Sequence, residues 1–176
     1  MDNLINIYKY FSKFVPNEIL KDGAVQPDVS AGSGYSEILS EILTMPTDAK
    51  IPEIGKYIFS ANSEFVSDKI KNSNELILFV EYGEAKYNPN AMPIENQRIA
   101  ITVAKSYSHS NSDNLNEVLV MNACKNILKT ILNRMADDDE SCELCQSVEL
   151  PAELVPVAPR DFFGNAGWAA FINLQF

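Results

Sequence analysis

The segment 162–176, FFGNAGWAAFINLQF, shows the alternation of a β-strand that is buried on one face. Its apolar positions recur with period two, at Trp168, Ala170, Ile172, Leu174 and Phe176. Asn173 and Gln175 occupy the other face, together with Phe171. This periodicity predicts a half-buried strand over residues 167–176. Because chain ends are loose unless a sheet holds them, we expect this strand to be paired.

Three further segments predict strands that could pair with it. Residues 74–82 (NELILFVEY) are continuously apolar, as in a central strand covered on both faces. Residues 98–107 (RIAITVAKSY) are rich in β-branched side chains, and residues 144–150 supply a shorter strand. The proline-containing segment 83–96 and the connection with Pro151, Pro156 and Pro159 are predicted to be loops.

The strongest helical pattern covers residues 114–135. Asn114 as N-cap and Glu117 three residues later resemble a capping box. One face carries apolar side chains at helical spacing, namely Val120, Cys124, Ile127, Leu128, Ile131 and Met135. Such a stripe predicts that the helix packs on the sheet. We expect the acidic run 137–140 to end it, because negative charge is unfavourable at a helix C-terminus.

The first part of the chain predicts mainly helices. Apolar spacing favours an amphipathic helix from Leu4 to Val15, ended by Pro16, and short helices over 17–21 and 36–44. Residues 24–34 are turn-rich. Residues 51–74 are ambiguous: either a strand (KYIFSA) and then a helix (NSEFVSDKIKN), or a helix that starts at Pro52 and runs through Phe59. The strand followed by a helix is favoured.

These elements predict an α+β fold with a small antiparallel or mixed sheet and helices packed mainly on one face. The length of 176 residues suits a single domain, 1–176, with a helical insertion or N-terminal elaboration at about 17–73. The longest apolar runs fall far short of the ~20 residues of a membrane span. We therefore expect no membrane association.

Charge and cysteine content exclude several classes. With 14 basic and 24 acidic residues the formal net charge is −10, and the basic residues do not cluster, so this chain alone is not expected to bind nucleic acid. Three cysteines, all in the second half, favour a reducing compartment over a disulfide framework.

Four patterns could indicate chemistry, and for each we favour a structural interpretation. CELC (Cys142 and Cys145) lies among acids that would raise thiol pKa values, and only Cys124 and His109 could complete a zinc site. The run DDDE (137–140) lacks the oxygen spacing and glycine of a calcium loop. His109 lies among serines without a nucleophile-elbow motif, and AGSGYS (31–36) lacks the lysine of a P-loop. We therefore predict no catalytic residue, no metal site and no cofactor.

The C-terminal aromatic residues are expected to be mostly core, with one exception. Phe171 falls on the face opposite Trp168, so it is the first candidate for contact with a neighbouring subunit. Phe162 and Phe163 are secondary candidates for the same interface.

Residues 74–176 resemble the small structural proteins at the neck of tailed bacteriophages. The resemblance is carried by the segments RIAITVAKSY, NLNEVLVMNACKNILKTILNRMADDDE and ELVPVAPRDFFGNAGWAAFINLQF, with their PVAP and GW motifs. Tail terminator, tail completion and head-tail ring adaptor proteins have this order of elements. The extra length at 17–73 departs from that pattern.

This resemblance implies a non-enzymatic virion protein at the tail or neck, made in the host cytoplasm. It would form a homo-oligomeric ring, contact other neck and tail proteins, and let DNA pass through its lumen without specific binding. Two alternatives remain open: a divalent-metal hydrolase that uses Asp137, Asp138, Asp139 and Glu140, and an acidic module that binds a basic partner.

Overall fold

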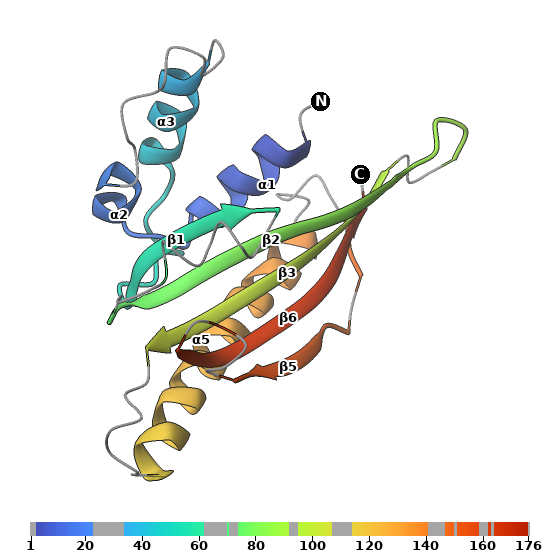
Figure 1. Cartoon of the computed structure of the whole chain (residues 1–176). Helices are drawn as coiled ribbons and strands as arrows, with labels where there is room; N and C mark the ends of the chain where they lie inside the picture. Colours follow the sequence, from blue (N-terminus) through green and yellow to red (C-terminus); the bar gives the residue numbers. More distant parts are fainter. Residues whose placement is uncertain are drawn as a thin grey trace. The chain divides into compact units, whose positions relative to one another are not determined.

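A computed structural model gives the fold of this chain (Figure 1). It describes residues 3–22, 34–61, 70, 74–91, 95–106, 114–140, 147–149, 151–158, 162 and 164–175. The chain divides into two compact units, 1–57 and 58–176. The boundary falls inside the region 17–73 that the sequence predicts to be an elaboration.

The first unit is mainly helical. It contains α1 (Asn3–Ser12), α2 (Asn17–Asp22), α3 (Tyr35–Thr44) and the first part of β1 (Ile54–Ser60). Its core is built from large apolar side chains that are almost fully buried, among them Ile7, Phe11, Phe14, Ile42 and Ile54. The predicted helices are confirmed, although α1 ends at Ser12 and a turn carries Phe14 and Val15 into the core. The β1 segment is a strand, as favoured; the helix expected after it lies outside the described residues, apart from the helical Ile70.

Tyr57 joins the strand segment of this unit to α1. Its hydroxyl donates to the carbonyl oxygen of Tyr8 at 3.2 Å, and the two rings stack with centroids 5.5 Å apart. Burial raises the pKa of Tyr57 well above its ordinary value, so the phenol remains a donor.

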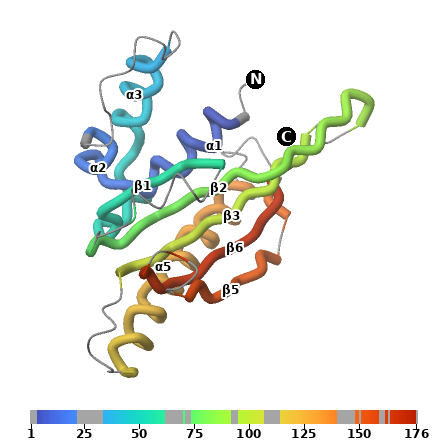
Figure 2. The backbone as a smooth tube through the Cα atoms, in the orientation of Figure 1, coloured from blue at the N-terminus to red at the C-terminus, as the bar shows by residue number. Residues whose placement is uncertain are grey.

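The second unit is built on a mixed sheet with one long helix, in which the pairs β2–β3, β3–β6, β4–β6 and β5–β6 are antiparallel. The sheet order is β1-β2-β3-β6-β4, and β5 also pairs with β6. Its strands after β1 are β2 (Leu76–Tyr87), β3 (Glu95–Ser106), β4 (Ser147–Val148), β5 (Glu153–Val157) and β6 (Asn165–Gln175). The helix α5 (Asn114–Glu140) contacts β3 and β6 (Figures 1 and 2). The α+β fold is therefore confirmed.

Strand alternation gives the sheet two different faces. On the face toward α5 lie Ile101, Ala170, Ile172 and Leu174, all at most 3% exposed, against the buried Cys124, Leu128, Ile131 and Met135 of the helix. The expected inward side of the terminal strand and the expected buried side of the helix are therefore confirmed; Phe176 lies outside the described residues.

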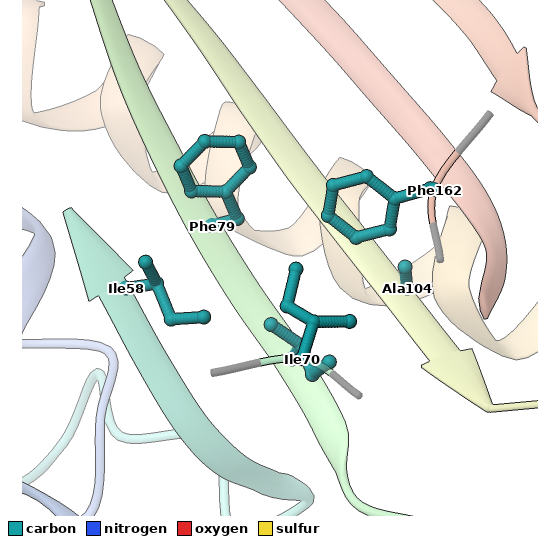
Figure 3. Packing of buried hydrophobic residues seen from close by; sticks show 6 residues of the cluster. Ile58, Ile70, Phe79, Ala104 and Phe162 are labelled. Carbon is teal, nitrogen blue, oxygen red and sulfur yellow. The ribbon is translucent and has the colours of Figure 1, made fainter. Parts of the chain in front are cut away.

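The opposite face is apolar at one end, where a cluster of buried side chains covers it: Ile58, Ile70, Ile77, Phe79, Ala104 and Phe162 (Figure 3). Phe162 stacks on Phe79 with ring centroids 5.9 Å apart. A turn positions it: Gly164 has φ 85°, and Asn165 donates its backbone N–H to the Phe162 carbonyl at 2.9 Å.

Three predicted boundaries are wrong. The segment 83–96 is strand at both ends, because β2 continues to Tyr87 past a bulge between Tyr82 and Ala85, and β3 begins at Glu95. The proline-rich connection contains β5; Pro156 is tolerated there because β5 is an edge strand. The helix α5 runs on to Glu140 instead of ending at the acids. Its Asp138 is 2% exposed and accepts a hydrogen bond from Arg134 Nε at 2.8 Å, which offsets the unfavourable helix end.

Gly167, the glycine of the GW motif, pairs with Ala104, and the backbone of β3 leaves no room there for a side chain. A Cβ built on it would lie 2.1 Å from the Val103 carbonyl oxygen and 2.6 Å from Ala104 Cα. Backbone atoms cannot move aside as a flexible side chain can, so only glycine fits here.

We expect Gly167→Ala to lower the free energy of unfolding by about 1–3 kcal/mol or more, because the added methyl group overpacks the strand pair. Gly83→Ala is the matched control, since its Cβ would meet Arg98 O at 3.4 Å. Denaturant titration measures both. A Gly167→Ala protein within about 0.5 kcal/mol of the unsubstituted protein would contradict the close approach.

Ile131→Ala should cost about 2–5 kcal/mol, because Ile131 is 0% exposed between α5 and the sheet. Asn133→Ala, on the exposed side of the same helix, should change stability by less than about 0.5 kcal/mol. Equal effects of the two substitutions in urea titration would show that the helix is turned differently.

Candidate functional site

A hollow of about 550 Å³ lies in the second unit, where β2, β3 and β6 meet the segment that leads into β5. Figure 2 traces these strands side by side. The residues that line it include Arg98, Phe171 and Asn173, which belong to the sheet face away from α5. This hollow therefore occupies the end of that face that the apolar cluster does not cover.

Phe171 is the aromatic side chain of the hollow. In the register of the sheet it lies between Ala100 of β3 and Glu153 of β5. It is 37% exposed, and the guanidinium carbon of Arg98 lies 5.7 Å from its ring centroid. Such an exposed cation-π contact contributes only about 0.5–1 kcal/mol. Much of the ring therefore remains available for contact with another molecule.

Carboxylates line the same hollow as this ring. Glu84, Glu149 and Glu153 line the hollow, against the two bases Lys86 and Arg98. The carboxylate of Glu149 is positioned by Asn173, whose Nδ2 donates to Oε2 at 2.7 Å. Phe171 pairs with Ala100 of β3, and Ala100 pairs in turn with Glu81 of β2. Burial raises the pKa of Glu81, which therefore keeps its proton to a higher pH than an exposed glutamate does.

Asn96 also lines the hollow, and its buried Oδ1 has no hydrogen-bond partner among the described residues. The aromatic ring of Phe171 and the carboxylates of the hollow can hold an apolar or aromatic side chain and accept hydrogen bonds from cationic or N–H donors.

The predicted interface residues do not lie together. Phe171 is exposed in the hollow, whereas Phe162 is 7% exposed and stacks on Phe79 in the core of its unit. We therefore do not place Phe162 in an interface, because its ring is already covered by its own chain. Phe163 lies outside the described residues.

The acidic run 137–140 does not form a site for a cation in the part of the chain that is described. Asp138 is buried and bonded to Arg134, while Asp137 is exposed on another side of the helix. Within the described residues, no three His, Cys, Asp or Glu side chains gather as a metal site requires. The side chain of Glu140 lies outside them.

Cys124 is the described cysteine, and its surroundings disfavour reactivity. Its thiol is buried, with Sγ 3.9 Å from the Ala166 carbonyl oxygen, and burial raises its pKa to about 11. Cys142, Cys145 and His109 lie outside the described residues, as do Ala31, Gly32 and Ser33 of AGSGYS.

Comparison of the chain with known protein families, with curated proteins and with solved structures finds no match. No helix in the described residues is long and apolar enough to cross a membrane. The geometry of the hollow is therefore the main structural guide to function.

In a Cys142→Ser/Cys145→Ser protein we expect Cys124 to resist a disulfide-exchange reagent at pH 8, because the thiolate is the nucleophile and the thiol pKa is about 11. The thiol should react fully after denaturation. Fast labelling of the folded protein would show that Cys124 is accessible.

The same double substitution tests the prediction that there is no metal site. The Cys142→Ser/Cys145→Ser protein should keep its melting temperature. Stoichiometric zinc in the unsubstituted protein, lost together with the fold in this variant, would contradict that prediction.

Proposed function

We propose that this chain is a structural assembly protein that forms a homo-oligomeric ring at the head-tail junction or tail end of a tailed bacteriophage. It is a tail terminator or connector adaptor without catalytic activity. Its place is the virion, next to other neck and tail proteins, after synthesis in the host cytoplasm. The resemblance of residues 74–176 to such proteins supports this proposal.

The observation that carries the proposal is the exposed Phe171 in the hollow. An aromatic side chain at the centre of a concave, partly polar surface is typical of an interface anchor, which contributes more to binding than to folding. The ring of Phe171 has strand residues on either side but remains 37% exposed. Contact with a second chain would bury it.

The acidity of the chain is consistent with a ring around DNA. A formal net charge of −10 repels phosphates, so DNA can pass along such a surface without being retained. Specific binding of DNA would instead need clustered bases.

The alternative of an acidic module for a basic partner is favoured by one observation. Glu84, Glu149 and Glu153 line the same hollow as Phe171. Such a module would remain a monomer until the partner is added, whereas a ring protein associates with itself.

Phe171→Ser tests the proposal, with Phe162→Ser as its counterpart in the core. Loss of an interface aromatic should lower the oligomer mass measured by light scattering while the melting temperature changes by only a few degrees. Phe162→Ser should instead lower the melting temperature, because Phe162 is 7% exposed.

Electron microscopy of the unsubstituted protein should show closed rings. A protein that is monomeric at every concentration, or a Phe171→Ser variant with unchanged mass and a large fall in melting temperature, would contradict a ring that is held together through Phe171.

A further inference from the structure

Arg98 has two possible partners on the hollow side of the sheet, one on each neighbouring strand. It pairs with Asn173 of β6, so Phe171 lies diagonally across from it, two residues along that strand. On β2, Glu81 pairs with Ala100 and is therefore diagonal to Arg98 in the same way. Paired residues share a face of the sheet, so all of them lie on the face away from α5. Diagonal neighbours are about 7–8 Å apart, within reach of a long side chain.

The strands leave room for the side chain of Arg98 to turn from Phe171 toward Glu81. A Cβ built on Gly83 would lie 3.9 Å from Arg98 Cβ, so β2 has a residue without a side chain opposite Arg98. Ala100, which separates Glu81 from Phe171 in their row, has only a methyl group. Arg98 is itself exposed, and exposed side chains change rotamer in picoseconds to nanoseconds. Both positions are therefore accessible to it.

In the structure Arg98 occupies the position at Phe171. Its guanidinium carbon lies 5.7 Å from the centroid of the aromatic ring. The carboxyl group of Glu81, by contrast, has no ion pair or hydrogen bond within the described residues. Burial raises the pKa of Glu81, and no neighbouring charge offsets this effect. A half-buried carboxyl group thus lies beside a cation that is turned away from it.

Arg98 is the ionisable residue that the strands next to β2 present to Glu81. The part of β1 in this unit, 58–60, has no ionisable side chain. On this face of β3, Arg98 is flanked by Asn96, Ala100 and Thr102. The remaining ionisable side chains of the hollow lie further along β2 or on the other side of β6: Glu84, Lys86, Glu149 and Glu153.

We infer that Arg98 is a two-position switch: it lies on Phe171 in the free chain and pairs with the Glu81 carboxylate when a second chain buries Phe171. In the first position, Arg98 covers part of the proposed interface anchor from within its own chain. In the second, it uncovers Phe171 and supplies Glu81 with a cation. The inference rests on the proposed function, because it describes how the contact at Phe171 is regulated.

The switch couples assembly to pH. In the free chain burial raises the pKa of Glu81, whereas Arg98 beside the carboxylate lowers it. Assembly therefore releases a proton at any pH between these two values, and it strengthens as the pH rises through that window. Because one proton is released, the apparent dissociation constant falls by at most about tenfold per pH unit.

The pH dependence of assembly tests the switch, with the apparent dissociation constant measured by analytical ultracentrifugation between about pH 5 and about pH 8. Glu81→Gln should raise this constant severalfold at the upper pH and remove one proton from the dependence, because glutamine resembles the protonated acid. Arg98→Gln should remove the same proton, since Glu81 then has no cation to pair with. Glu117→Gln, at an exposed position of α5, is the matched control and should keep the original dependence. Circular dichroism verifies that each variant is folded.

Titration of Glu81 tests the two positions without assembly. Phe171→Ser removes the first partner and should be monomeric, so Arg98 should pair with Glu81 in this variant. The pKa of Glu81, followed by carbon NMR of its carboxyl group, should therefore be lower in Phe171→Ser than in Phe171→Ser/Arg98→Gln. Phe171→Ser/Lys129→Gln is the matched control: it removes a base from an exposed position of α5 and should leave the pKa of Glu81 unchanged.

Two results would overturn the switch and leave the proposed function in place. In the first, the pKa of Glu81 in the Phe171→Ser protein is the same with and without Arg98. In the second, the pH dependence of assembly survives Glu81→Gln unchanged. An unsubstituted protein that is monomeric at every pH would instead contradict the proposed function, and the titration would then decide the movement of Arg98 by itself.

Discussion

The ladder between β3 and β6 is the interaction on which the rest of the second unit depends. It pairs residues along both strands from Asn96 with Gln175 to Ser106 with Asn165. Its close approach at Gly167 fixes the register, because a side chain is sterically excluded there. Since side chains alternate along a strand, a slip of one residue would exchange the two faces of β6. The same register therefore sends Ile172 toward α5 and Phe171 into the hollow.

The two faces of the sheet have different roles. The face toward α5 is apolar along its middle, from Ile99 to Val103 on β3, and closes the core. The other face changes from the buried cluster around Phe79 to a charged and aromatic surface around Phe171. A sheet that is covered on only part of one face has surface left for binding without a further domain.

Much of this fold could be predicted from local patterns. The alternation from Trp168 to Leu174 and the apolar stripe from Cys124 to Met135 gave the correct buried sides, because periodicity depends on burial alone. The edge strand β5 was missed because Pro156 suggests a break, although an edge strand needs only one side to be paired. The outer end of the β2–β3 hairpin was missed because exposed polar residues show no apolar period.

The candidate site was less predictable than the fold. The outward position of Phe171 followed from period two, but the glutamates join it only through the pairing of distant strands: Glu84 lies in β2, Glu153 begins β5 and Glu149 follows β4. No short-range pattern contains that register. The burial of Asp138 was equally hidden, since four neighbouring acids suggest a solvated surface until Arg134 is seen to bond one of them. The apolar residues Leu115, Val118 and Leu119 of α5 are plain in the sequence, but they can be assigned to the exposed side of the helix only once its buried side is known.

The position of β6 in the sheet has a consequence for folding. This strand is the last described one in the chain but lies inside the sheet, between β3 and the two short strands β4 and β5. Its partner β3 is far away in sequence, so the central ladder closes a long loop, and such non-local pairing slows folding. During synthesis, β2, β3 and α5 leave the ribosome before β6 exists to cover them. Their apolar surface is then exposed to other chains, and a chaperone that binds nascent apolar segments would protect it until synthesis is complete.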